Sequence, residues 1–221
     1  MIIRRLSIYK KAFLPGFFLL LLLPFFVHGQ PEGYKLVSNT EFVTQKVNEA
    51  SASTNTINSS FIQEKNLSFI EEKVISKGIL LYEKPDKLRL EYKEPFTYIM
   101  IMNGGRMMTD NGEKKSEYDL KSNKMFSEIN NLIISAVKGN ILNNAGFKAE
   151  LFENQEKLFI KLIPLEKELG KYIKTIGLFM NKKDYTVDEL QITEQSDDFT
   201  QIRFINKAIN EEIPPASFNM Q

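Results

Sequence analysis

Strict alternation of apolar and polar residues is the feature that most limits what this chain can fold into. Between Lys87 and Lys93, the side chains of Leu88, Leu90 and Tyr92 fall on one face and charged side chains on the other. This period of two predicts a half-buried β-strand. Similar alternation, or a short apolar run between turn signals, recurs at residues 61–63, 74–84, 98–102, 106–109, 115–120, 147–153, 158–163, 174–180, 187–194 and 200–206. A sheet of about ten or eleven strands must close, curl or be covered, because open edges invite further pairing.

Three segments have helical spacing instead. Residues 38–53 can be capped by Ser38 or Asn39. Their apolar side chains fall on one face: Phe42, Val43, Val47 and Ala50. Residues 127–139 repeat apolar side chains at helical spacing between a serine cap and a glycine stop. A shorter helix is expected around residues 166–172. The chain is therefore expected to be mainly β, with few helices.

The first 29 residues have the layout of a secretory signal peptide. A basic start precedes an apolar run at residues 12–27, and Gly29 then permits cleavage before Gln30. A membrane anchor is the alternative, but a bilayer-spanning helix needs about 20 apolar residues. This run is shorter, and Pro15 and Pro24 interrupt it. We therefore expect residues 1–29 to be a signal peptide and residues 30–221 to form a single domain.

Charge and missing residue types restrict the chemistry. Of the 29 basic residues, four lie in the predicted signal peptide, so 25 remain against 28 acidic residues and the net charge is about −3. This balance offers no basic excess for nucleic acid. The chain has no cysteine, and its one histidine, His28, lies in the signal segment. The exported domain would lack the usual catalytic triads and zinc ligands, so we expect no catalytic residue, metal or cofactor.

Two patterns keep a hydrolase open as an alternative. Ser135 and Lys138 match the Ser-x-x-Lys arrangement of a serine nucleophile with a lysine base. The same pattern occurs inside the predicted signal peptide, at Ser7, where it has no meaning. Asp197 and Asp198 would be candidates for a carboxylate pair in glycoside hydrolysis. Their polar neighbours favour a solvated turn.

Short motifs along the predicted domain resemble, in order, those of the LolA outer-membrane lipoprotein carriers. They are Phe61-Ile62-Gln63, Ser76-Lys77-Gly78 before Ile79-Leu80-Leu81-Tyr82, Lys84-Pro85-Asp86-Lys87-Leu88-Arg89, Glu94-Pro95, Asn103-Gly104, Asp184-Tyr185-Thr186-Val187, and Ile213-Pro214 with Phe218. The resemblance implies an incomplete antiparallel β-barrel of about 10–11 strands, whose concave side is closed by a helical lid.

The resemblance also implies a function. LolA-like proteins receive acylated lipoproteins from an ABC-type extractor in the inner membrane, shelter the acyl chains across the periplasm, and release them at the outer membrane. We therefore expect a monomeric periplasmic chaperone that binds lipid chains, with an outer-membrane acceptor as a possible further partner. A periplasmic sensor of lipids or lipopeptides with the same fold is the alternative.

The expected site follows from this resemblance and from the apolar strand faces. The acyl-chain cavity would be lined by Phe61, Leu80, Tyr82, Leu88, Leu90, Tyr92, Met100 and Met102. The lid and its latch would comprise Lys84, Leu132, Ile133 and Val137. Many family members have arginine where this chain has Lys84, and aromatic residues where it has Leu88 and Leu90. Plain core packing is the alternative for the strand face and the methionines.

Overall fold

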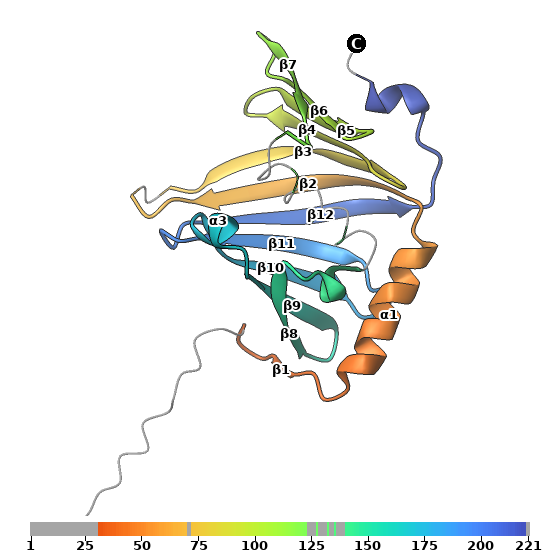
Figure 1. The fold of residues 1–221 in the computed structure, drawn as a ribbon, viewed down its shortest axis with the longest axis vertical. Helices are drawn as coiled ribbons and strands as arrows, with labels where there is room; N and C mark the ends of the chain where they lie inside the picture. The colour runs from red at the N-terminus through yellow and green to blue at the C-terminus, as the bar shows by residue number, and fades with distance from the viewer. Residues whose placement is uncertain are drawn as a thin grey trace, which may run out of the picture. The chain divides into compact units, whose positions relative to one another are not determined.

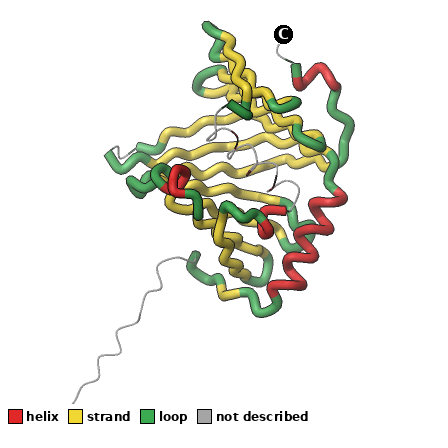
Figure 2. Tube along the Cα trace, viewed as in Figure 1, coloured by secondary structure: helices red, strands yellow, loops and turns green. Residues whose placement is uncertain are grey.

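A single antiparallel sheet dominates the computed structural model, which describes residues 31–69, 72–122, 127, 132, 135 and 140–219. Figure 2 shows that strands make up most of this part of the chain. The strands are β1 (Lys35–Leu36), β2 (Thr56–Asn66), β3 (Val74–Glu83), β4 (Lys87–Glu94), β5 (Tyr98–Asn103), β6 (Arg106–Asp110), β7 (Lys115–Asp119), β8 (Phe147–Glu153), β9 (Lys157–Pro164), β10 (Ile173–Asn181), β11 (Val187–Glu194) and β12 (Phe199–Ile209). The predicted signal peptide lies outside the described residues.

The helical elements are few and short in the described ranges. They are α1 (Thr40–Ser53), α3 (Lys167–Gly170) and the 3-10 turns η1 (Asn140–Asn143) and η2 (Pro215–Phe218). Ser127, Leu132 and Ser135 are also helical, whereas most of the helix expected at residues 127–139 lies outside the described residues.

The sheet is open. Across the residues that the structure describes, it has 12 strands in the order β1-β8-β9-β10-β11-β12-β2-β3-β4-β5-β6-β7, and no pairing joins β1 to β7 (Figure 1). The expected mainly β antiparallel fold is confirmed, as an open sheet that does not close into a barrel. The extra strand is β1, which has two residues and is too short to produce an alternating pattern.

The strand register brings apolar residues of neighbouring strands to the same face. Directly paired residues of an antiparallel sheet project to one side. Two apolar rows cross β3, β4 and β5 in this way: Leu80, Leu90 and Met100, and Tyr82, Leu88 and Met102. We call the side of the sheet against which α1 packs the inner face, and the opposite side the outer face.

Helix α1 packs on the inner face, along the end of the sheet where β12 finishes and β2 begins (Figure 1). Its first turn is capped because the Asn39 side-chain oxygen accepts a hydrogen bond from the Phe42 amide at 3.0 Å. Val43 and Val47 are buried. Phe42 was expected beside them but is 51% exposed, and the Lys46 ammonium lies 5.8 Å from its ring centroid. The face of α1 that contacts the sheet is thus narrower than its apolar spacing predicted.

Three apolar clusters stabilise the sheet. The largest joins α1 to the inner face of β9 and β10, and includes Val43, Val47, Leu158, Ile160, Leu162, Ile176, Leu178 and Met180. The second lies on the inner face of β3 to β6 and includes Tyr82, Leu88, Met102, Met107 and Leu120. On the outer face, the C-terminal residues Ile213 and Phe218 cover Ile101. The two larger clusters are therefore on the inner face.

Gly78 makes room for the ring of Phe61 on the neighbouring strand. A Cβ atom at Gly78 would lie 2.6 Å from the Phe61 Cζ atom and 2.0 Å from the Glu91 carbonyl oxygen. Phe61 is 1% exposed, so its ring has no free space into which to move. The glycine is thus required by the packing of the inner face.

We predict that Gly78→Ala lowers the free energy of unfolding by about 1–3 kcal/mol, the usual cost of overpacking a core. Urea unfolding followed by circular dichroism measures this change. Gly170→Ala is the matched control, because a Cβ there would meet no atom within 4 Å. Equal stability losses in the two variants would contradict the prediction.

Candidate functional site

A small cavity lies between α1 and the inner face of the central strands. Its volume is about 90 Å³. The lining residues come from α1, from strands β2, β3 and β10 to β12, and from the segments that flank them: Val47, Ala50, Ser51, Thr54, Ile57, Ser59, Leu80, Met180, Tyr185, Thr186, Val187, Phe204, Lys207 and Ile209. Pockets that hold drug-sized ligands usually measure roughly 300–1,000 Å³. A long ligand would therefore enter only if the groups that cover the cavity moved.

Two hydroxyl groups of the wall direct their hydrogen bonds toward backbone. The Thr54 hydroxyl donates to the Ala50 carbonyl at 2.8 Å, and the Ser59 hydroxyl donates to the Ile205 carbonyl at 2.9 Å. Buried hydroxyls that are satisfied in this way do not require a polar ligand. The cavity thus presents a mainly apolar surface in spite of its serine and threonine residues.

The eight expected cavity residues all lie on the inner face. Leu80 lines the cavity directly. Phe61, Tyr82, Leu88 and Met102 are buried, whereas Leu90, Tyr92 and Met100 are partly buried. The second apolar cluster contacts both Ile57 and Leu80, which also line the cavity. The structure therefore brings the expected residues together beside the cavity, as a continuation of its wall.

Two tyrosines of this wall differ in their hydrogen bonding. The Tyr92 hydroxyl donates to the Gln63 side-chain oxygen at 2.9 Å, and burial, with Tyr98 nearby, raises the pKa of Tyr92. The buried Tyr82 hydroxyl has no hydrogen-bond partner among the described residues. Burial and the Asp86 carboxylate raise the pKa of Tyr82 to about 12. Both hydroxyls are consequently neutral at physiological pH.

Lys84 contacts a helix that covers the inner face. Its ammonium group donates to the carbonyl oxygens of Ser51 at 2.7 Å and Ala52 at 2.8 Å, in the last turn of α1. The last carbonyls of a helix lack helical partners and carry partial negative charge, so a cation is favourable there. Of the expected lid residues, Leu132 packs against the largest apolar cluster. Ile133 and Val137 lie outside the described residues.

Sequence patterns had not identified most of the lining residues. Ile57, Phe204 and Ile209 sit on β2 and β12, which are neighbours in the sheet but far apart in the chain. Their alternation was detectable in part, because β12 was expected at residues 200–206. A register shift in β12 after Ile205 breaks the period of two, and this hid the contribution of Lys207.

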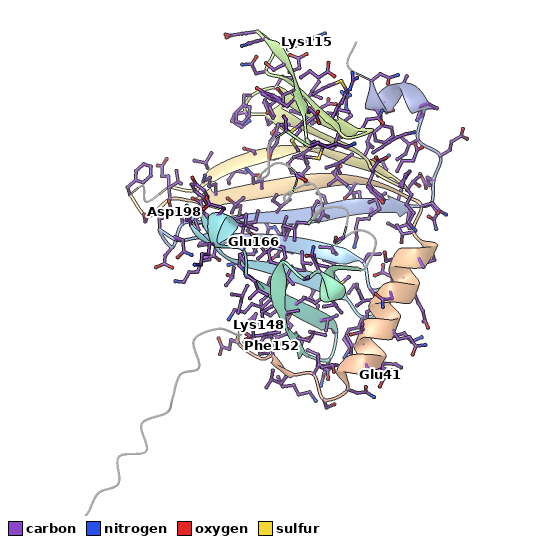
Figure 3. All side chains as sticks on the ribbon, in the orientation of Figure 1. Glu41, Lys115, Lys148, Phe152, Glu166 and Asp198 are labelled. Carbon is purple, nitrogen blue, oxygen red and sulfur yellow. The ribbon has the colours of Figure 1, made fainter. Side chains whose placement is uncertain are left out.

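The candidate carboxylate pair lies away from the cavity. Asp197 and Asp198 occupy the turn between β11 and β12 (Figure 3). Asp197 contacts the Lys174 ammonium at 2.5 Å, and Asp198 accepts a hydrogen bond from the Ser68 amide at 2.6 Å. Both carboxylates thus hold turns together.

In the described ranges, no group of three or more metal-binding side chains occurs. None of the helices in these ranges is long and apolar enough to cross a bilayer.

We predict opposite effects from removing the two tyrosine hydroxyls. Tyr82→Phe should raise the free energy of unfolding by about 1 kcal/mol, because an unpartnered buried hydroxyl is costly. Tyr92→Phe should lower it by about 1 kcal/mol, because its bond to Gln63 is lost. Urea titrations measure both.

The two proteins should also differ in alkaline solution. The pKa of Tyr82 is raised from 10.0 to about 12 in the folded protein, so the unfolded chain loses this proton more readily. The stability linked to this proton is present below pH 10 and is lost as the pH rises through 12. Tyr82→Phe should lack that alkaline loss, and the same loss in both proteins would contradict this assignment.

We predict that Lys84→Met loosens the end of α1. The substitution keeps the apolar stem but removes two charged hydrogen bonds, so the free energy of unfolding should fall by about 1–3 kcal/mol. Hydrogen exchange of amides in the last turn of α1 should accelerate. Lys114→Met, in an exposed turn, is the control. Unchanged exchange in Lys84→Met would show that Lys84 does not hold the helix.

Solved structures with a similar fold come from several bacteria. A LolA superfamily protein of Nitrosomonas europaea is 7% identical, with a TM-score of 0.44 over 80% of this chain and 97% of that one. A putative outer membrane lipoprotein-sorting protein domain of Vibrio parahaemolyticus is 10% identical, with a TM-score of 0.46 over 80% and 95%. The MucA/MucB complex of Pseudomonas aeruginosa gives 10% identity and a TM-score of 0.49, over 80% of this chain and 59% of the matched one. A comparison with curated proteins gives no match.

A family model provides the assignment. The model described as "Outer membrane lipoprotein carrier protein LolA" matches residues 52–221. The match covers β2 to β12 and therefore all the strands that line the cavity. This chain belongs to the LolA family of outer membrane lipoprotein carrier proteins.

Proposed function

We propose that the protein is a periplasmic carrier that binds the acyl chains of lipoproteins on its inner face and moves them from the inner to the outer membrane. The observation that carries this proposal is the apolar inner face, which α1 covers only in part and which contains a cavity beside Leu80. Its described polar groups are largely satisfied by the protein itself. Such a surface suits an apolar chain and offers no chemistry for a reaction.

The energetics favour a carrier with a cover that competes with its cargo. An acyl chain of about 15 methylene groups gains roughly 12 kcal/mol on leaving water, at about 0.8 kcal/mol per methylene. Two or three such chains would bind too tightly to be released. In the described structure α1 packs Val43 and Val47 against the sheet. Loading would have to break those contacts, and their recovery on unloading would offset part of the gain.

The cavity wall suits chains of different shape. Met100, Met102 and Met107 lie on neighbouring strands of the inner face, and Met180 lines the cavity itself. Methionine is unbranched and polarisable, so it adapts to irregular apolar ligands. Lys84 would limit the opening, because its ammonium group binds the end of α1.

Family membership and the N-terminal sequence support a proposal about the partners. We propose export through the predicted signal peptide, loading by an ABC-type extractor in the inner membrane, and release to the outer membrane with or without an acceptor protein. The carrier would act as a monomer.

The test is to express the full chain in a bacterium with two membranes, purify the periplasmic protein without detergent, and identify bound molecules by native mass spectrometry. We predict that acylated lipoproteins co-purify with the wild type. Leu80→Glu should abolish co-purification, because an alkyl chain packed in the cavity would remove water from the carboxylate at a high cost in free energy. Leu165→Glu is the matched control, since Leu165 is 60% exposed.

A second variant separates loss of binding from loss of fold. Ala50→Leu fills the cavity from α1 with a good helix former and adds no charge. It should keep the circular dichroism spectrum of the wild type and lose cargo. Recovery of free phospholipid alone would favour the lipid sensor of the same fold. Equal lipoprotein recovery from all variants would exclude the inner face as the binding surface.

A further inference from the structure

Two irregularities in the sheet meet at one corner of the cavity. On β12, the register shifts between Ile205, which pairs with Ser60, and Ala208, which pairs with Asn58. On β11, the register with β10 skips Asp188. A β-bulge inserts an extra residue and re-aims the side chains around it. These bulges turn Lys207 toward the cavity and place Asp188 next to it.

The Lys207 ammonium group lies at the cavity wall. It donates to the Thr186 hydroxyl oxygen at 2.6 Å, to the Asp188 carboxylate at 2.6 Å, and to the Val187 carbonyl at 3.2 Å. Thr186, Val187 and Lys207 line the cavity, whereas Asp188 is not a lining residue. The ammonium group therefore has a carboxylate on one side and cavity-lining acceptors on the other.

Two cations share one carboxylate at this corner. The Lys157 ammonium lies 3.7 Å from the second Asp188 oxygen. A second carboxylate, Asp184, accepts a hydrogen bond from the Thr186 hydroxyl and balances the charge of the group as a whole. Only 17% of the Lys207 side chain is exposed, so its charge is poorly solvated. A cation in this position attracts an anion more strongly than one in open water.

The turn before β11 adds a strained residue to the same corner. Tyr185 lines the cavity with a φ of 53°, a conformation that bulky side chains rarely adopt. Its amide donates to the Asn181 carbonyl at 2.7 Å, which holds the turn. Strain of this kind is often found at binding sites. The next residue, Thr186, donates its hydroxyl proton to Asp184 at 2.9 Å, so its oxygen is available as the acceptor for Lys207.

We propose that Lys207, positioned by Thr186 and Asp188, forms a headgroup site for a carboxylate or phosphate at the end of an alkyl chain that lies in the cavity. The oxyanion would replace the Val187 carbonyl, the most distant of the three acceptors, and accept a charge-assisted hydrogen bond from Lys207. Asp188 would stay behind the ammonium group, and Lys157 would compensate its charge. This inference rests on the proposed acyl-chain cavity and adds anionic lipids to its ligands.

The test compares probes that share one alkyl chain and differ in headgroup. Binding of palmitate, hexadecyl phosphate and neutral monopalmitin to the full-length exported protein is measured by calorimetry below the micelle concentration. The two anions should bind about tenfold more tightly than monopalmitin, which is the usual advantage of one hydrogen bond between charged groups. A preference for palmitate alone would identify a fatty-acid carboxylate as the ligand, and a preference for hexadecyl phosphate alone would identify a lipid phosphate.

Two substitutions test whether the preference for anions comes from Lys207 and Asp188. Lys207→Met keeps an apolar stem, so monopalmitin should bind as before and the preference for anions should disappear. Asp188→Asn removes the competing carboxylate and should raise the affinity for the anions about tenfold, without affecting monopalmitin. Lys114→Met, in an exposed turn, is the charge-matched control for Lys207→Met.

The outcomes separate this proposal from the carrier function. Equal affinities for all three probes in the wild type would overturn the headgroup site and leave the acyl cavity intact. Failure of every probe to bind would overturn both. If Lys207→Met does not fold, Asp188→Asn decides: an unchanged preference in that variant would overturn the proposal.

Discussion

An apolar sheet face that its own strands cannot cover is the constraint on which the rest of this structure depends. In a closed barrel the inner side chains of opposite strands would fill the interior. Here the described strands end at β1 and β7 without pairing, so the inner face must be covered by other parts of the chain. Helix α1 does this over β9 to β12, with Asn39 capping its start and Lys84 binding its end. Lys84 therefore attaches the end of the helix to β3 and β4, and two buried valines attach its middle to the sheet.

Under the proposed carrier function, this cover would be exchangeable with a ligand. The contacts that α1 makes with the sheet are apolar and non-directional, and an alkyl chain can provide contacts of the same kind. The wall of the cavity continues into the cluster around Tyr82 and Leu88 through Ile57 and Leu80. A chain that displaced part of the cover would therefore find a continuous apolar surface.

Polar groups on the inner face divide into two kinds. Thr54 and Ser59 donate their hydroxyl protons to backbone carbonyls. Lys207 is different, because a bulge turns it toward the cavity and its charge shares a carboxylate with Lys157. In an interior of low polarity, such charges interact more strongly with their partners, and leaving them unpaired costs more free energy. The corner at Lys207 is therefore where the cavity can distinguish ligands by their headgroups.

The sequence by itself determined where most of the strands lie and, where alternation is strict, which of their side chains share a face. Alternation is local, and it placed Leu88, Leu90 and Tyr92 on a common side before their strand was paired. Leu80 and Met100 lie in continuous apolar runs, so alternation did not assign their face. The sequence also predicted a cap at Ser38 or Asn39, since capping needs only neighbouring residues, and the structure selects Asn39. The two-residue β1 was missed because it is too short to show an alternation. Phe42 was placed on the buried face because helical spacing does not say how wide the buried stripe of a helix is.

Only the tertiary structure decided where the cavity lies and which charges reach it. The cavity needs β2 beside β12 and α1 across both, and these contacts join residues more than a hundred positions apart. The bulges at Asp188 and Lys207 depend on strand register, which is fixed by the packing of whole strands rather than by the residues at the bulge. Alternation also did not decide whether the sheet closes, because the same alternating strands fit a barrel or an open sheet. Local periodicity specifies the direction of a side chain, and long-range pairing specifies what it meets.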